Sequence, residues 1–192
     1  MTSRRCHYEV AFETYLRERR IPYVAAEPAR YRVPGRPGVK LFDYIVDGNH
    51  DRRFLVDVKG RKVTKSPRAR GWDTWVTAAD LDGLRLWQAA FGNGFTAAFV
   101  FAHWLVGVEQ PTHARGFDLA GRTYVFSVVL LDDYLARSRQ RSTRWRTVCV
   151  PRSEFQSIVH APQTVWPNGT DPADSLPASI AALPPGCVSY NR

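Results

Sequence analysis

The sequence predicts an α/β domain in which a mixed central sheet is flanked by helices. The chain has 192 residues and is 44% hydrophobic, which is enough to bury one core. Apolar residues recur at helical spacing in residues 4–20, and apolar runs typical of strands lie on both sides of a second helical pattern. These patterns predict the order helix, strand, strand, strand, helix, strand, with additional strands and a helix toward the C-terminus.

The first half of the chain supplies the first helix and three strands. The helix at 4–20 ends before Pro22, which cannot continue it. Residues 21–26 suit a short strand, and a loop containing Pro and Gly follows at 31–38. Strands are then expected at 41–47 and 53–58, the second ending at Gly60. The polar and basic segment 61–75 is expected to form a loop.

The second half begins with a helix that Thr77 could cap and Gly92 could end. Strands are expected at 95–106 and 124–131, a short helix at 132–141, and a last strand at 144–150. Residues 1–160 are therefore expected to form a single domain. Residues 161–192 are Pro-rich and have little periodicity, which predicts a poorly ordered tail.

The sequence carries no signal for a membrane or a secretory pathway. No apolar run approaches the ~18 residues that a membrane span needs, and the first residues lack the pattern of a secretion signal. The three cysteines lie far apart, without the spacing of a disulfide framework or a zinc site. A cytoplasmic protein with reduced thiols and no membrane partner is the expectation.

The net charge of +9 is concentrated in two segments. Six basic residues and no acid lie between Lys59 and Arg70, and six arginines and no acid lie between Tyr134 and Arg152. Such clusters are typical of a surface that binds a polyanion, because phosphate contacts release counterions. The alternative is a basic surface that is simply solvated.

Two of the expected strands carry charged residues in their apolar parts. Asp57 and Lys59 lie two residues apart and therefore on one face of their strand, and a hairpin-like pairing could bring Asp43 beside Asp57. Glu9 lies at the edge of the inward stripe of the first helix. Carboxylates held together repel each other, and a bound Mg²⁺, which prefers oxygen ligands, usually relieves this repulsion. The alternative is that the two aspartates pair structurally with Lys59 and nearby arginines.

These residues resemble the PD-(D/E)XK nuclease superfamily, which has the restriction-endonuclease-like fold with an αβββαβ core. Glu9 matches its first-helix glutamate, Asp43 its first aspartate, and Asp57-Val58-Lys59 its (D/E)-x-K segment. The spacing of Glu9 from the helix end is similar to that of Holliday-junction resolvases. The opening "HYEVAFE" resembles the uncharacterised bacterial HYExAFE family. Phe42 stands where the superfamily has a proline.

The resemblance and the chemistry together imply a Mg²⁺-dependent DNA endonuclease that acts in repair, recombination or defence, with Mn²⁺ as a substitute metal. Glu9, Asp43, Asp57 and Lys59 are the expected catalytic residues. Asp43, Asp57, the Val58 carbonyl and Glu9 would hold the metal, and Lys59 would position or deprotonate water. A homodimer is compatible with the resemblance. The alternative is a catalytically inactive nucleic-acid-binding module with the same fold.

Residues around this site extend the hypothesis. The basic residues after the (D/E)-x-K segment could clamp a phosphate backbone, or form a solvated loop; they are Arg61, Lys62, Lys65, Arg68 and Arg70. Trp72 and Trp75 could stack on bases, although packing in the core is the other interpretation. Glu13 and Gln88 are possible accessory residues. Gln88 could orient a phosphate or a water molecule, and Arg85 is the alternative for that role.

Overall fold

The computed structural model describes residues 6–27, 31–33, 35–48, 52–65, 72–110 and 115–167, and the statements below refer to these residues. The elements in chain order are α1 (His7–Glu18), β1 (Tyr23–Ala25), β2 (Tyr44–Asp47), β3 (Arg53–Thr64), β4 (Val76–Thr77), α2 (Ala78–Phe91), β5 (Phe95–Val106), β6 (Phe117–Leu119), β7 (Arg122–Leu130), α3 (Leu131–Arg137), β8 (Arg139–Ser142), β9 (Thr147–Cys149), α4 (Arg152–Phe155), β10 (Val159–His160) and α5 (Pro162–Val165).

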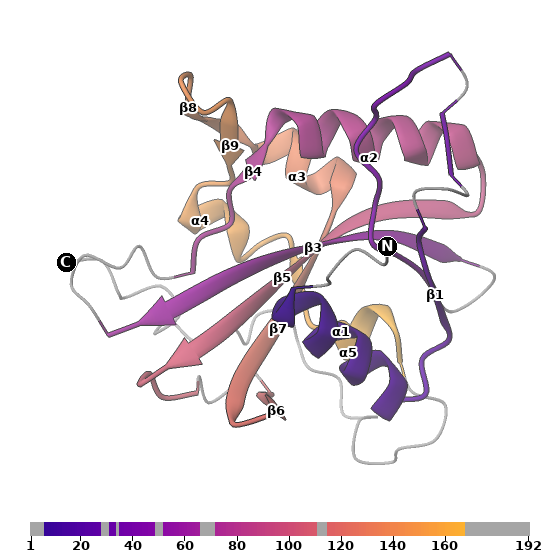
Figure 1. Cartoon of the computed structure of the whole chain (residues 1–192). Coiled ribbons are helices and arrows are strands. Elements are labelled where there is room, and N and C mark those ends of the chain that lie inside the picture. Colours follow the sequence, from indigo (N-terminus) through magenta and orange to yellow (C-terminus); the bar gives the residue numbers. More distant parts are fainter. Residues whose placement is uncertain are drawn as a thin grey trace.

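The main sheet is mixed and has the strand order β1-β2-β3-β5-β7-β10, with β6 paired to β7 (Figure 1). Strands β3 and β5 are parallel over their whole length, whereas the other neighbours are antiparallel. The parallel pair is possible because the chain crosses between these strands through α2. The predicted fold class and the predicted order αβββαβ are thus confirmed, with the two-residue strand β4 inserted before α2.

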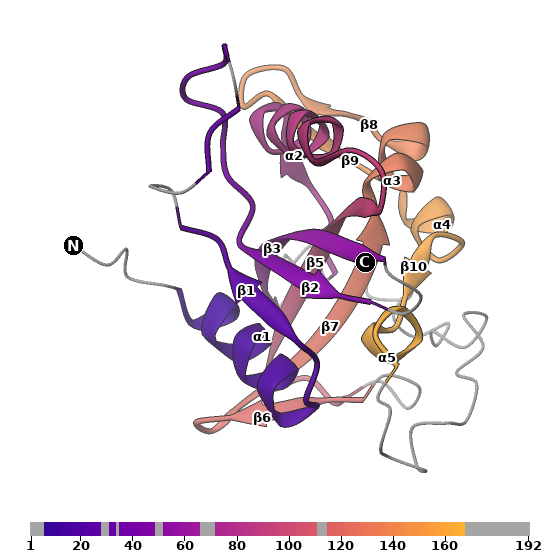
Figure 2. The same ribbon diagram turned by 90° about the vertical axis from the view of Figure 1, so that its right-hand side faces the viewer.

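Helices cover both faces of the main sheet, as Figure 2 shows. Helix α1 and the segment around α5 pack on one face, where Phe12 and Leu16 meet the even-numbered residues Val56 and Val58 of β3. Helices α2 and α3 pack on the other face against Leu55 and its neighbours. The alternation of side chains along β3 therefore directs Asp57 and Lys59 toward the α2 face.

Strand β3 is longer than predicted, because it continues past Gly60 to Thr64. Its pairing with β5 gives residues 61–64 the hydrogen bonds of a ladder, so these residues do not form the expected loop. Gly60 does not end the strand, and its lack of a side chain leaves room for Tyr8 of α1. A Cβ atom at this position would lie 2.1 Å from the Tyr8 ring, which covers the strand from α1.

The segment expected to contain a longer helix and one last strand forms a shorter helix and a hairpin. Helix α3 ends at Arg137, and strands β8 and β9 form a hairpin whose turn contains Trp145. Strand β9 also pairs with β4, which produces a second sheet of order β4-β9-β8. The helical spacing of residues in the sequence did not show where the helix ends and the hairpin begins.

The packed part of the chain continues beyond the expected boundary at residue 160. Trp166, at the end of α5, is only 1% exposed and lies among Phe12 and Phe54 of the α1 face. The remaining residues of the expected tail, 168–192, lie outside the described residues. No helix in the described part of the chain has the length and apolar character to cross a membrane.

We expect Trp166→Ala to lower the free energy of unfolding by about 3–5 kcal/mol, because it removes a large side chain from the core. Chemical denaturation followed by circular dichroism measures this change. The matched control is Trp145→Ala, which removes a side chain that is 68% exposed and should change stability by less than about 0.5 kcal/mol. Equal effects of the two substitutions would contradict the packing of residues 161–166 into the domain.

Candidate functional site

Asp43 and Asp57 are brought together by the register of β2 and β3. Tyr44 pairs with Val56, and the Asp43 N–H donates to the Val56 carbonyl at 2.8 Å. Asp43 directly precedes β2, and repulsion from Asp57 acts on its carboxylate, so the two acids lie close together. The Val58 N–H donates to Asp43 Oδ2 at 2.7 Å, which orients the carboxylate across the strands. The predicted pairing of these aspartates is therefore present.

Both carboxyl groups are held where ionisation is unfavourable. Burial, followed by repulsion from Asp57, raises the pKa of Asp43 to about 8, although the Val58 N–H partly offsets the shift. Burial also raises the pKa of Asp57, which is only 4% exposed, whereas the positive charges of Lys59 and Lys40 lower it. Asp43 has no cationic side chain within ion-pair distance in the described part of the chain.

Lys59 forms ion pairs with two acids rather than one. Its Nζ lies 2.6 Å from Asp57 Oδ2 and 3.0 Å from Asp80 Oδ1, and the residue is 8% exposed. Lys40 Nζ donates to the same Asp80 oxygen. Burial alone would raise the pKa of Asp80, but Lys59 and the bonds from Lys40 and Thr77 hold it well below its usual range.

Asp80 is positioned by the start of α2, and the sequence interpretation missed its role. The Thr77 hydroxyl accepts from the Asp80 N–H at 3.1 Å, and Asp80 Oδ2 accepts from the Thr77 N–H at 2.8 Å. This reciprocal capping box confirms Thr77 as the helix cap and leaves Asp80 Oδ1 for the two lysines. The spacing Thr77-x-x-Asp80 is a signal in the sequence, whereas nothing in the sequence indicates that Lys40 reaches Asp80.

The acidic residues of α1 occupy different surroundings. Glu9 is in the first turn, accepts from the Cys6 thiol at 3.1 Å, and contributes to the raised pKa of Asp43. Its backbone carbonyl accepts from the Tyr44 hydroxyl at 3.1 Å, which ties α1 to β2. Glu13 accepts from the Tyr23 hydroxyl at 2.9 Å and is therefore directed toward β1.

The carboxylates of this site supply part of what a divalent cation requires. Within the described ranges, no group of three or more His, Cys, Asp or Glu side chains is arranged to hold a metal ion. Mg²⁺ is usually bound by one or two carboxylates together with water and substrate oxygens. The mutually repelling pair Asp43 and Asp57 fits that requirement, whereas Glu9 does not form a group of three ligands with them.

The five basic residues expected to clamp phosphate do not share one loop. Arg61 is half-buried on β3, donates to the Gly60 carbonyl at 2.7 Å and to the Trp75 carbonyl, and burial lowers its pKa. Lys62 is directed to the other face, where its Nζ lies 5.1 Å from the centre of the Trp104 ring. Lys65 is exposed, and Arg68 and Arg70 lie outside the described residues.

The expected accessory side chains also have structural partners. The ring of Trp72 lies 4.5 Å from that of the buried His103, and the Arg61 guanidinium lies 4.3 Å from the centre of the Trp75 ring. Gln88 Oε1 accepts from the Ala97 N–H at 2.5 Å, and its Nε2 donates to Asp132 at 3.3 Å. Gln88 thus connects α2 with the start of β5 and with α3. Arg85 is exposed on α2.

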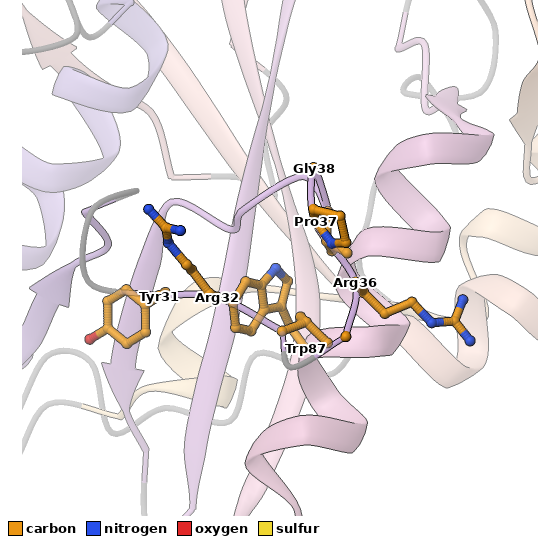
Figure 3. Close-up of a pocket in the computed structure, with 9 residues that line it drawn as sticks. Tyr31, Arg32, Arg36, Pro37, Gly38 and Trp87 are labelled. Carbon is orange, nitrogen blue, oxygen red and sulfur yellow. The ribbon is translucent and has the colours of Figure 1, made fainter.

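A separate pocket of about 470 Å³ lies between the segment 31–39 and α2. Figure 3 shows Tyr31, Arg32 and Arg36 arranged around Trp87, with Pro37 and Gly38 beside them. Trp87 Nε1 donates to the Lys40 carbonyl at 3.0 Å, which ties the residue after this segment to α2, the helix that carries Asp80. None of the carboxylates described above lines the pocket.

The structure is a mixed α/β domain. It carries a cluster of aspartates and lysines at one end of the paired strands β2 and β3. No protein-family model matches the chain, and no curated protein matches its sequence. Among solved structures, the chain is similar to Hjc, a Holliday junction resolvase from the archaeal hyperthermophile Archaeoglobus fulgidus. The identity is 12%, the TM-score is 0.44, and the match covers 79% of this chain and 91% of that chain. A likeness this distant carries no conclusion about activity.

The raised pKa of Asp43 predicts how stability depends on pH. Since its value in the folded state is about 8, above the ordinary 3.8, the folded protein holds a proton that the unfolded chain releases between these values. The stability that Asp43 contributes is complete below the lower value and is lost as pH rises through about 8, with a slope of at most about 1.4 kcal/mol per pH unit. Urea denaturation in EDTA at several pH values measures it. Asp43→Asn should reduce the slope, and an unchanged slope would contradict the assignment.

Proposed function

We propose that the chain is a Mg²⁺-dependent endonuclease that hydrolyses DNA phosphodiester bonds and acts in DNA repair, recombination or defence. The observation that carries the proposal is the Asp43 carboxylate, which lies beside Asp57 and has no cationic side chain within ion-pair distance among the described residues. A bound divalent cation would remove this repulsion. The resemblance of Glu9, Asp43 and Asp57-Val58-Lys59 to the PD-(D/E)XK motif supports the same reaction class.

Asp43, Asp57 and the Val58 carbonyl would hold the cation, with Glu9 acting through water. When bound, the cation supplies Lewis-acid stabilisation of the phosphate charge and lowers the pKa of a bound water. Asp43 is only partly buried as a residue, which leaves access from solvent. Asp43 must lose its proton before it can act as a ligand, so its raised pKa favours binding above about pH 8.

Lys59 would orient the attacking water or a phosphate oxygen. Its ammonium group now donates to both Asp57 and Asp80. If Asp57 turns to a cation, Asp80 still holds Lys59, because the capping box fixes the second acid on the rigid start of α2. The lysine thus keeps its position while it exchanges one acceptor for a substrate oxygen or water.

A catalytically inactive nucleic-acid-binding module is the second candidate. It is favoured by the balance of charges in the cluster, where Lys59 and Lys40 match Asp57 and Asp80. Such a module would bind DNA without needing a cation at Asp43. The two functions therefore differ in cleavage and in metal dependence, and share only DNA binding.

We expect Asp57→Ala to reduce Mg²⁺-dependent cleavage more than about 100-fold, because a direct ligand matters more than the outer partners of a metal site. DNA binding in EDTA should be retained. Lys59→Ala should lower the rate of cleavage by about 10²–10⁴-fold through loss of the group that orients water. Cleavage of a labelled panel of duplex, junction, flap and single-stranded DNA measures both effects.

The matched control is Asp47→Ala, which removes an exposed acid at the end of β2 whose carboxylate lies 3.4 Å from Arg53 Nε. It should cleave as the wild type does. Equal activity of wild type, Asp57→Ala and Lys59→Ala would show that a contaminant cuts the DNA. Binding without cleavage by the wild type in Mg²⁺ and Mn²⁺ would favour the inactive module.

A further inference from the structure

The hairpin β8–β9 presents an exposed indole at its turn. Trp145 is 68% exposed, whereas the other large apolar side chains exposed in the described ranges are the aliphatic Val10 and Val24. The Arg144 guanidinium lies 5.2 Å from the centre of the Trp145 ring. An indole left in water contributes nothing to the core, although a planar ligand could cover it.

The hairpin also carries positive charge that the described residues do not neutralise. Arg139 is paired, with its Nη2 2.5 Å from Glu154 Oε1. In the part of the chain that the structure describes, Arg141, Arg144 and Arg146 have no acid within ion-pair distance. The exposed indole therefore lies in a positively charged surface, a combination typical of proteins that bind single-stranded nucleic acid.

Contacts between side chains connect the hairpin with the strand that carries Asp57 and Lys59. The Arg141 guanidinium lies 5.3 Å from the centre of the Trp75 ring, and the Arg61 guanidinium lies 4.3 Å from the same ring. Arg61 is two residues after Lys59 on β3. The Trp75 ring thus lies between an arginine of the strand that carries Lys59 and an arginine of the hairpin.

A backbone contact fixes the turn of the hairpin beside α2. The Ala78 N–H donates to the Arg146 carbonyl at 2.8 Å, and Thr77 pairs with Thr147. Asp80, which holds Lys59, is two residues further along the same helix. Figure 1 shows β8 and β9 next to β4, where α2 begins. A strand of nucleic acid that follows this surface would therefore reach the acidic cluster.

We propose that the hairpin β8–β9 binds an unpaired nucleotide of the DNA substrate. Trp145 stacks on the base, and Arg144 and Arg146 contact the flanking phosphates. A blunt duplex could contact the arginines, but its bases stay stacked inside the helix and do not reach the indole. An acidic protein surface could also contact the arginines, but it offers no planar face to the indole. The inference rests on the proposed function and narrows its substrate to DNA with an unpaired segment near the cut.

Fluorescence anisotropy of labelled oligothymidylate and of a blunt duplex, both in EDTA, tests this proposal. Trp145→Ala should weaken binding of the single strand about tenfold, since base stacking on an aromatic side chain supplies a large share of such affinity. Binding of the duplex should change less than about twofold. Arg144→Gln combined with Arg146→Gln should weaken both and reduce the salt slope for the single strand by about 1.4.

Arg17→Gln is the matched control, because Arg17 is an exposed arginine on α1, on the other face of the sheet. It should bind both DNAs as the wild type does. Unchanged binding of oligothymidylate by Trp145→Ala, or equal losses for strand and duplex, would overturn the proposal. Because nothing is cut in EDTA, these outcomes are separate from the failure of the nuclease proposal, which the Asp57→Ala cleavage comparison decides.

Discussion

Repulsion between Asp43 and Asp57 is the interaction on which the rest of the site depends. The pairing of β2 with β3 brings the two carboxylates close together, and the Val58 N–H holds that of Asp43 in place. Asp57 is almost fully buried and Asp43 is partly buried, so neither charge is fully solvated and burial raises the pKa of each. Holding two acids in that position therefore costs free energy of folding.

The neighbouring charges relieve only part of this cost. Lys59 and Lys40 balance Asp57 and Asp80, and the capping box at Thr77 makes Asp80 a rigid member of the network. Replacing a buried ion pair by packed apolar groups is often neutral, or stabilising by about 1–4 kcal/mol, so stability alone does not explain the network. Asp43 in particular adds a repulsive charge. Under the proposed function, a divalent cation bound by Asp43 and Asp57 would offset this repulsion.

Much of this arrangement could be predicted from the sequence because it depends on local periodicity. Alternation along β3 placed Asp57 and Lys59 on one face, and the pattern of apolar runs predicted the αβββαβ order. The residues that were missed depend on contacts between distant segments. Lys40 reaches Asp80 because the segment before β2 packs on α2. Trp166 reaches the core from a Pro-rich segment in which apolar residues do not recur at regular spacing.

The basic segments show the same limit. A run of charges indicated a polyanion surface, but not which face each side chain takes. Because β3 continues as a strand, Arg61 and Lys62 are directed to opposite faces, and Arg61 is packed against Trp75 instead of projecting from a loop. The second segment, once expected to be a helix end and a strand, forms the hairpin that presents Trp145. Pairing between strands decided both outcomes.

Isothermal titration calorimetry with Mg²⁺ in buffers of different ionisation enthalpy tests the central claim most directly. If Asp43 and Asp57 hold the cation, the wild type binds it and releases up to about one proton below pH 8, with the release declining as pH rises. Asp43→Asn should reduce the proton release and weaken binding, because one of the two carboxyl groups with a raised pKa is removed. Absence of binding by the wild type, or binding and proton release that Asp43→Asn leaves unchanged, would contradict the assignment of this pair as a metal site.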